Sequence, residues 1–371
     1  MTALDLSPLE EILIAFFGSM FFTWIIIPRL IKVVSTLRLT DKPGKRKVHN
    51  AEIPTLGGLG IFGGFAFGFH LAINGYISGV PYFTAAVIIL FFLGIEDDLV
   101  NIKPRKKIYV EVFAALIIFF FTDMRFTNFH DFLGITIIPF WLSLLTTIFL
   151  VVVIINSLNL IDGIDGLAAS IGIIASTVMG VWFWFSGDYG YAIMASSLLG
   201  ALVVFLWFNL SNSLRKLFMG DTGSLVIGFI LSVMIIRFNE INAGSSTLHN
   251  LRSAPAISIA ILIVPLFDTL RVFTLRTLNR RSPFIGDKRH IHHLMLGAGY
   301  SHRISTLYIS IAQIIIIALA FALDHIGILW LSLILLLICL GLIELIKLKV
   351  RRNVERMRLS GKKKKRADTI I

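Results

Sequence analysis

Four short polar segments interrupt an otherwise apolar chain, and the first contains the carboxylate pair Asp97–Asp98. Adjacent carboxylates repel each other unless a proton or a cation lies between them, as in a general-base or divalent-metal site. The alternative is a pair of solvated acids at a helix end, balanced by the basic residues Lys103, Arg105, Lys106 and Lys107. The pair by itself leaves both interpretations open.

The second segment reads NSLNLIDGIDG over residues 156–166. On a helix or its 3₁₀ extension, a polar residue at every third position produces one polar stripe. The stripe comprises Asn156, Asn159, Asp162 and Asp165. Helix capping or hydrogen bonding between helices is the alternative, although four groups exceed what a cap requires. The spacing is not that of a calcium-binding loop.

The third segment, FMGDTGS, covers residues 218–224 just ahead of an apolar block. Backbone N–H groups at a helix N-terminus, surrounded by small residues, suit phosphate oxygens or a metal-bound anion. An ordinary N-cap formed by Asp221 or Thr222 is the alternative.

The fourth segment contains His290, His292 and His293, directly after Lys288 and Arg289. Imidazoles can bind a metal, transfer protons or, when charged, hold phosphate. The spacing lacks the HExxH pattern of zinc hydrolases, and the single cysteine lies in an apolar block, so we favour phosphate contact over zinc or a structural loop.

Taken together, these segments offer hard carboxylate and amide oxygens beside basic side chains. Such oxygens select Mg²⁺ or Mn²⁺ bridging a diphosphate, because these metals bind through a few carboxylates plus substrate oxygens. The residues therefore indicate phosphoryl chemistry at a membrane surface.

Long apolar blocks must position these segments. Of the 371 residues 56% are apolar and only 15% charged, and the mean hydropathy is +0.86, which leaves too little polar surface to coat a soluble globule. The blocks of roughly 16–23 residues match the helix length that crosses about 30 Å of hydrocarbon. We predict an all-α polytopic membrane protein with about eleven transmembrane helices, at residues 10–27, 54–73, 80–96, 108–122, 137–155, 164–185, 191–208, 223–238, 254–270, 306–323 and 326–346.

The first block follows the acidic residues Asp5, Glu10 and Glu11 rather than a basic region, so we interpret it as a retained helix and not as a signal peptide. Residues 1–346 would then form one integral membrane domain, and residues 347–371 a basic cytosolic tail.

The distribution of basic residues predicts the orientation. Segments on one side of the eleven crossings hold 31 of the 34 Lys and Arg residues, and the other side holds only Arg125, Arg237 and Arg252. Because basic loops stay in the cytosol, the N-terminus should lie outside, and the C-terminus and all four polar segments should lie in the cytosol. The same bias accounts for the net charge of +12 without a nucleic-acid partner.

The motifs also carry a family resemblance. GIEDD, NSLNLIDGIDGLAA, FMGDTGSL and DKRHIHHLMLGAGYS, in this order between about Asp41 and Ser305, resemble the polyprenyl-phosphate N-acetylhexosamine-1-phosphate transferases of glycosyltransferase family 4. The histidine run followed by LGAGYS is similar to the branch that starts O-antigen, enterobacterial common antigen or teichoic-acid linkage synthesis. The peptidoglycan branch carries three consecutive histidines, a run that Ile291 interrupts here.

The resemblance implies roles for single residues. It implies that Asn159 and Asp221 bind Mg²⁺, for which Mn²⁺ could substitute, and that Asp165 and Phe218 bind uracil. The residues that it implies hold the diphosphate are Lys107, His290, His292 and His293.

Asp97, Asp98 and Asp162 are the expected catalytic carboxylates, and for the Asp97–Asp98 pair the resemblance leaves open whether they deprotonate the lipid phosphate or bind metal.

The implied reaction moves N-acetylhexosamine 1-phosphate, with N-acetylglucosamine as the default sugar, from a UDP-sugar to undecaprenyl phosphate at the cytosolic face of a bacterial inner membrane. UMP would leave, and the product would begin a cell-envelope polysaccharide. Membrane lipids are further expected partners, and a homodimer is left open.

Two alternatives remain beside this reading. A phospho-N-acetylmuramoyl-pentapeptide transferase of peptidoglycan synthesis would use the same chemistry on another sugar. A secondary transporter would place acidic residues in the middle of its helices and show internal repeats, whereas here the acids cluster at helix ends.

Overall fold

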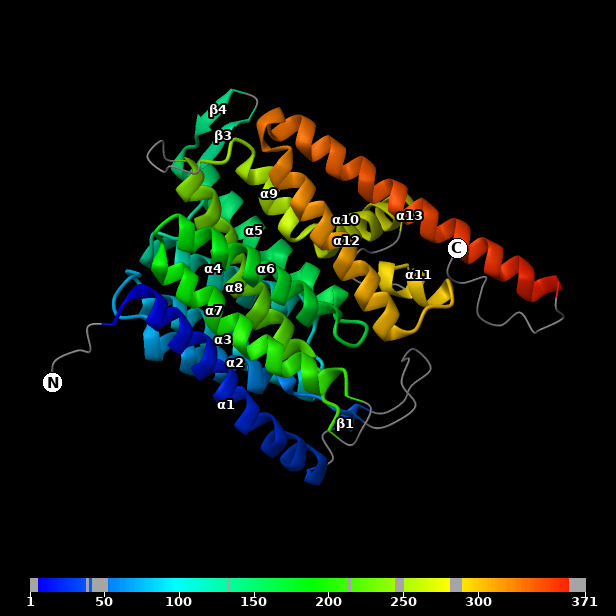
Figure 1. The fold of residues 1–371 in the computed structure, drawn as a ribbon, viewed down its shortest axis with the longest axis horizontal. Coiled ribbons are helices and arrows are strands. Elements are labelled where there is room, and N and C mark those ends of the chain that lie inside the picture. The colour runs from blue at the N-terminus through cyan, green and yellow to red at the C-terminus, as the bar shows by residue number, and fades with distance from the viewer. Residues whose placement is uncertain are drawn as a thin grey trace.

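Long helices packed side by side make up most of the structure (Figure 1). The computed structural model describes residues 6–37, 40–41, 53–132, 134–211, 215–243, 250–280 and 289–359. The helices are α1 (Pro8–Thr36), α2 (Gly57–Ala72), α3 (Val80–Val100), α4 (Pro104–Phe121), α5 (Phe140–Ile161), α6 (Leu167–Phe185), α7 (Tyr189–Asn209), α8 (Gly220–Ala243), α9 (Ala254–Ile261), α10 (Ile263–Leu278), α11 (Ile291–Gly297), α12 (His302–Ala322) and α13 (Ile328–Leu359). The predicted all-α polytopic class is confirmed.

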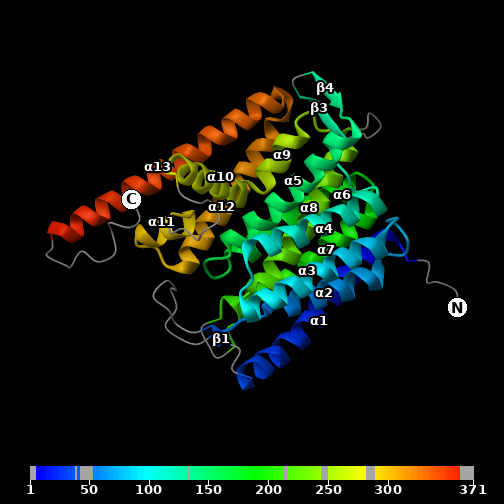
Figure 2. The same cartoon turned by 180° about the vertical axis from the view of Figure 1, so that it is seen from behind.

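Two short antiparallel hairpins and one 3₁₀ turn complete the elements. β1 (Thr40–Asp41) pairs with β2 (Ile53–Pro54), and β3 (Asn128–Phe132) pairs with β4 (Ile135–Ile137). The 3₁₀ turn η1 (Asp324–Ile326) joins α12 to α13. Seen from behind, β1 and α11 lie at one end of the molecule, and the β3–β4 hairpin lies at the opposite end (Figure 2).

Each of the eleven predicted spans overlaps one helix or the bent pair α9–α10. In the described part of the chain, seven helices are long and apolar enough to cross a membrane, or eight if the bent pair counts as one span, and α2 is a shorter apolar helix. The count of eleven and the sides of the termini remain predictions. The predicted boundary between domain and tail at residues 346–347 falls inside α13, and the basic run 362–366 lies outside the described residues.

Helix α8 forms the centre of the bundle. Its apolar residues from Leu225 to Ile236 are buried on every side, as expected for a helix that is hydrophobic all round. Helices α2, α3, α5 and α6 surround it. Gly228 permits close packing of α8 against α5, because a Cβ atom there would lie 2.7 Å from the Cα of Ile155.

The predicted span 254–270 is not one straight helix. It breaks at Leu262 into α9 and α10, which meet at 84°. Pro265 explains the break, because a proline has no N–H to donate to the carbonyl four residues earlier, which is that of Ile261. The side chain of Gln313 on α12, fully buried, donates a 2.8 Å hydrogen bond to this carbonyl instead.

Candidate functional site

A polar cavity of about 460 Å³ opens at the end of the bundle that holds α11. It lies among the C-terminal ends of α3 and α5, the N-terminal end of α8, and α11. Nine of the eleven predicted site residues line it: Asp97, Asp98, Asn159, Asp162, Asp165, Phe218, Asp221, His292 and His293. Lys107 and His290 do not line the cavity.

Close backbone packing fixes the segment that enters α8. The N–H groups of Gly57 and Gly58 donate to the carbonyls of Phe218 and Met219, both at 2.8 Å. A Cβ atom on Gly58 would lie 2.1 Å from the backbone nitrogen of Gly223, which leaves no space for any side chain at Gly58. Helix α2 therefore holds the FMGD segment through its backbone, so the position of Asp221 depends little on side-chain packing.

The surroundings of the two adjacent carboxylates differ. Asp98 accepts hydrogen bonds from the N–H of Asp221 at 2.7 Å, the N–H of Thr222 at 3.1 Å and the hydroxyl of Thr222 at 2.6 Å. Its carboxylate thus caps the N-terminus of α8 from a different helix, since the first N–H groups of a helix have no intrahelical acceptor. For Asp98 these contacts are those of a positioning residue, and its catalytic role stays a prediction.

Asp97 and Asp221 share one cation. Lys107 Nζ lies 3.0 Å from Asp221 Oδ2 and also pairs with Asp97, while Asp97 Oδ1 accepts a 2.8 Å bond from the N–H of Ile102. The side chain of Lys107 is only 18% exposed and lies behind these carboxylates rather than on the cavity wall. Asn159 donates to the other Asp221 oxygen and, at 2.9 Å, to Ser224.

Asp162 follows the last residue of α5. Burial and then the negative charges of Asp221, Asp98 and Asp165 raise the pKa of Asp162 to about 8. A carboxylate in this position favours a proton or an added cation, because either one relieves the repulsion.

Asp165 lies on the part of the cavity wall that also carries the basic side chains Lys216 and His302. Lys216 Nζ lies 2.6 Å from Asp165 Oδ2 and 5.5 Å from the ring centre of Phe218, and His302 Nδ1 lies 3.4 Å from the same oxygen. Burial alone would raise the pKa of Asp165, but His302 and Lys216 outweigh it and hold that pKa below its usual value. Asp165 and Phe218 therefore share a neighbour, Lys216.

The three histidines take different positions. His290 Nδ1 lies 2.8 Å from Asp268 Oδ2 on α10, and Arg271 Nη2 lies 2.8 Å from the other oxygen of Asp268. The Asp268 carboxylate also accepts a 2.9 Å bond from the N–H of Ile291, so this cluster anchors the start of α11. The predicted contact of His290 with the diphosphate differs from this placement, since the ring is buried against α10.

His292, by contrast, faces the cavity with His293. Burial, followed by the proximity of His293, lowers the pKa of His292 to about 3, so its ring is neutral at physiological pH. Within the described part of the chain no group hydrogen-bonds to His292 Nδ1. A Cβ atom on Gly163 would lie 2.3 Å from His292 Nε2, which ties the histidine run directly to the α5–α6 turn.

One residue of the predicted stripe lies outside the cavity, and three residues in or beside it were not singled out in the sequence. Asn156, predicted to share the polar stripe, instead donates to the buried Glu111, because the stripe turns away from the cavity before Asn159. Asn209 at the end of α7 accepts a 2.5 Å bond from the N–H of Gly166 and donates a 2.8 Å bond to the carbonyl of Leu217, which joins two motifs. Its signal was a lone amide at the end of an apolar block. Lys216 and His302 gave only the weak signal of lying next to recognised motifs.

The donor set suits a hard divalent cation. The cavity holds five carboxylates and the amide of Asn159, and the pKa of Asp162 is raised by burial first and then by the negative charges of three of these carboxylates. Among the described residues, no three carboxylate, imidazole or thiol groups are close enough to enclose a metal. This arrangement fits Mg²⁺, which binds through one or two carboxylates and completes its shell with water and substrate oxygens.

Comparison with known proteins supports the family resemblance drawn from the motifs. Residues 80–239 match the family described as glycosyl transferase family 4. A relative from Bacillus subtilis (strain 168), named a probable undecaprenyl-phosphate N-acetylglucosaminyl 1-phosphate transferase, is 32% identical over 346 residues, which cover 91% of each chain. The undecaprenyl-phosphate alpha-N-acetylglucosaminyl 1-phosphate transferase of Escherichia coli (strain K12) is 30% identical over 286 residues, 76% of this chain and 75% of that relative. The chain belongs to the polyprenyl-phosphate N-acetylglucosamine-1-phosphate transferases within glycosyl transferase family 4.

Proposed function

We propose that the protein transfers N-acetylglucosamine 1-phosphate from UDP-N-acetylglucosamine to undecaprenyl phosphate and releases UMP. One observation carries the proposal: helix ends far apart in the sequence bring carboxylates, amides, a lysine and histidines into one cavity at one end of an apolar bundle, with Lys107 directly behind two of the carboxylates. The relatives from Escherichia coli and Bacillus subtilis are named for this sugar and this lipid. An oxygen of the lipid phosphate would attack the phosphorus that bears the sugar, and the bond from that phosphorus to the oxygen of UMP would break.

The region around Asp165 would hold the uridine. Asp165 offers carboxylate oxygens to the uracil N–H, Phe218 offers an aromatic face, and Lys216 holds Asp165 in place through the 2.6 Å ion pair. The diphosphate would then extend toward His292 and His293, the cavity-facing histidines. The unpartnered Nδ1 of His292 would accept or donate a hydrogen bond there.

Asp221 and Asn159 would hold Mg²⁺, with Mn²⁺ as a substitute. The bound ion would supply neutralisation of the charge that builds up on the diphosphate during transfer. Lys107 would offset the charges of Asp97 and Asp221 from behind, although burial and the neighbouring Asp221 still raise the pKa of Asp97 to about 7. Positioning and charge neutralisation are the main demands of phosphoryl transfer.

Asp97 would accept the remaining proton of the lipid phosphate. Unlike Asp98, it is not engaged in capping α8, and its Oδ2 pairs with the ammonium of Lys107. The pH dependence of Asp97→Asn tests this role. A base predicts a loss of rate that is largest at low pH and recovers partly above about pH 6, the usual second phosphate pKa. A loss independent of pH and rescued by added Mg²⁺ would assign Asp97 to the metal instead.

The site would face the cytosol, where UDP-sugars are made, in the inner membrane of a bacterium. The product would begin synthesis of a cell-envelope polysaccharide. Cysteines placed at Ser78 and Arg352 in a Cys339→Ala background would then react with a membrane-impermeant maleimide from opposite sides of the membrane. Reaction of both from the same side of intact cells would refute this orientation.

Incubation of the purified protein with undecaprenyl phosphate and a panel of UDP-sugars tests the reaction. The panel comprises UDP-N-acetylglucosamine, UDP-N-acetylgalactosamine and UDP-N-acetylmuramoyl-pentapeptide, with lipid product read by mass and UMP by chromatography. We expect product from the first donor and none from the pentapeptide donor. Product from the pentapeptide donor alone would move the protein to peptidoglycan synthesis, and release of no UMP from any donor would refute the transfer.

A further inference from the structure

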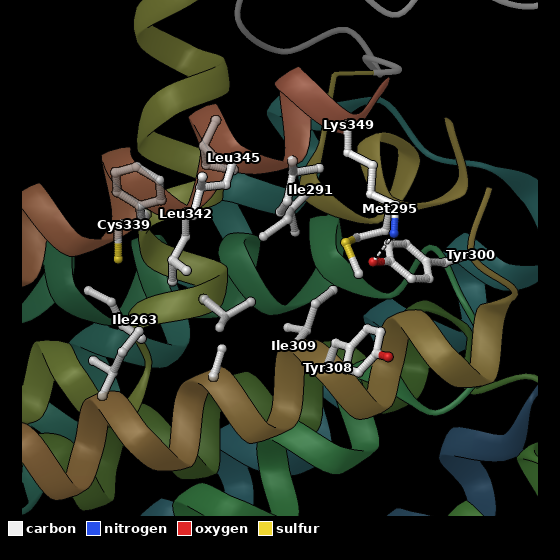
Figure 3. A pocket seen from close by; sticks show the side chains of 16 residues that line it. Ile263, Ile291, Met295, Tyr300, Tyr308, Ile309, Cys339, Leu342, Leu345 and Lys349 are labelled. Atoms are coloured by element: carbon white, nitrogen blue, oxygen red, sulfur yellow. Dashed lines mark hydrogen bonds between the residues drawn. The ribbon is translucent and has the colours of Figure 1, made fainter. Parts of the chain in front are cut away.

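A second cavity, of about 330 Å³, lies between α10, α11, α12 and α13 (Figure 3). Its lining is apolar except at one end, and it shares no lining residue with the polar cavity. The view along it shows Cys339 and Ile263 at one end and Lys349 with Tyr300 at the other. The cavity is therefore an elongated apolar chamber that ends at a single ammonium group.

The chamber opens toward the outer surface of the bundle. Its inner wall is buried, with Met295 and Ile309 each 4% exposed, whereas the rim residues Tyr308 and Leu345 are 49% and 63% exposed. An empty apolar cavity loses the dispersion contacts that a chain of methylene groups would make with its lining. In a bilayer, the group available at this rim is the hydrocarbon chain of a lipid.

The ammonium group of Lys349 favours an occupant that carries negative charge. Its Nζ lies 3.9 Å from the ring centre of Tyr300 and donates to the hydroxyl of that residue, and its side chain is exposed. Among the described residues no carboxylate pairs with Lys349, whereas Lys347 on the same helix pairs with Glu344 at 2.5 Å. An ammonium and a phenol hydroxyl at the mouth of an apolar chamber match a phosphate group followed by a hydrocarbon chain.

We propose that this chamber holds one acyl chain of an anionic phospholipid, with its phosphate at Lys349. The lipid acceptor of the reaction fits less well, because all the carboxylates of the site line the other cavity, on the far side of α11. An acceptor with its phosphate at Lys349 would have its reacting group outside that cavity. The occupant is thus a lipid that supports the enzyme and is not consumed.

Helix α11 is the wall that the two cavities share. Ile291 and Met295, four residues apart on one helical face, line the apolar chamber, while His292 and His293 line the polar cavity. A lipid chain packed against Ile291 and Met295 would support the helix that carries the two histidines. Occupancy of the chamber should therefore affect the turnover rate without the lipid touching the substrates.

Native mass spectrometry of the purified full-length protein tests the site, with added dioleoyl phosphatidylglycerol, dioleoyl phosphatidylcholine or undecaprenyl phosphate. We expect tighter retention of phosphatidylglycerol than of phosphatidylcholine. Lys349→Gln should reduce that retention by about fivefold, which corresponds to roughly 1 kcal/mol for one lysine beside an anionic lipid. Lys347→Gln, two residues away on α13, is the matched control and should retain the lipid.

Ala312→Phe, which would fill the chamber from α12, should abolish retention of the phospholipid. If that variant fails to fold, the comparison of Lys349→Gln with Lys347→Gln still decides. Equal retention of both phospholipids, or equal loss in both lysine variants, would overturn the proposal. Displacement of phosphatidylglycerol by undecaprenyl phosphate, sensitive to Lys349, would assign the chamber to the acceptor and likewise overturn it. None of these readouts depends on transferase activity, so the lipid site and the proposed reaction can fail separately.

Discussion

Asp98 Oδ1 accepts a 2.7 Å hydrogen bond from the backbone N–H of Asp221, which joins the last turn of α3 to the first turn of α8. Two motifs separated by more than a hundred residues are thus linked by a helix cap. One member of the acidic pair holds the site together, and the other faces Lys107. The two carboxylates should therefore respond differently to substitution.

We expect Asp98→Ala to lower both the stability and the rate. Loss of an N-cap acceptor costs about 0.5–2 kcal/mol, and the end of α8 carries Asp221. The measurement is the apparent unfolding temperature in detergent together with UMP release. Asp98→Asn, which retains one of the two acceptor oxygens, should recover only part of the stability. Unchanged stability in Asp98→Ala would argue against the cap.

Asp221→Ala should show the opposite pattern, with the rate lowered at least about hundredfold and the unfolding temperature nearly unchanged. Removal of this carboxylate takes a ligand from the expected metal but leaves the backbone contacts of Phe218 and Met219 intact. Asp123→Ala, at the other end of the bundle, is the control. If more than about a tenth of the rate remained at saturating Mg²⁺, a difference of only about 1.4 kcal/mol, Asp221 would not be a ligand.

Lys216→Met should weaken donor binding more than it slows turnover. Without its 2.6 Å partner, Asp165 loses the cation that holds its orientation beside Phe218. We expect the KM for the UDP-sugar to rise by about tenfold, in line with the roughly 1.5–3 kcal/mol of a hydrogen bond to a charged group, and kcat to fall much less. Lys216→Arg, which keeps the charge, should rescue the KM. A fall in kcat with KM unchanged would place Lys216 at the reacting phosphates instead.

Asp162 should make the metal-free protein less stable as pH rises. In the unfolded chain its pKa is near the ordinary 3.8, and in the folded protein burial and neighbouring carboxylates raise it to about 8. Between these values the folded state binds a proton that the unfolded state lacks, so stability falls from about pH 4 to about pH 8 and changes no further above that.

The neutral variant Asp162→Asn removes this dependence. With EDTA present, its unfolding temperature should exceed that of the wild type by a margin that grows from pH 5 to pH 8. Added Mg²⁺ should narrow the margin at pH 8, because a cation relieves the same repulsion. Parallel pH curves for the two proteins would contradict the raised pKa.

Gln313→Leu should destabilise the bend between α9 and α10. The variant leaves the buried carbonyl of Ile261 without a donor, at a cost of about 1–3 kcal/mol. A lower unfolding temperature in detergent is the expected readout, with Ile314→Leu on the exposed face of α12 as the control. An unchanged unfolding temperature would mean that another donor replaces Gln313.

The sequence predicted most of the helices, because blocks of apolar residues long enough to span a bilayer leave few other structures. It also predicted that most site residues converge, since the motifs lie at helix ends on one side. The break at Pro265 had a signal, a proline inside a predicted span, but the identity of the donor that satisfies Ile261 depends on how α12 packs.

The contacts of Asp98 and His290 could not be predicted in the same way. Each depends on a partner in a distant segment, Asp98 on the N-terminus of α8 and His290 on Asp268 of α10. Spacing within a motif reports which residues share a helix face. It does not report which of two adjacent carboxylates meets the end of another helix.

The 84° turn between α9 and α10 has a consequence for how a lipid could react. Because α10 turns away from the direction of α9, the residues Leu270 and Phe273, both exposed, run across the bundle at the level where Asp268 anchors α11. If α10 lies in the membrane interface, as amphipathic helices do, the histidines of α11 would be held at that same depth. An acceptor at that depth could present its phosphate to the enzyme while its long tail stays dissolved in the bilayer, so catalysis would require sideways diffusion and no extraction of the lipid.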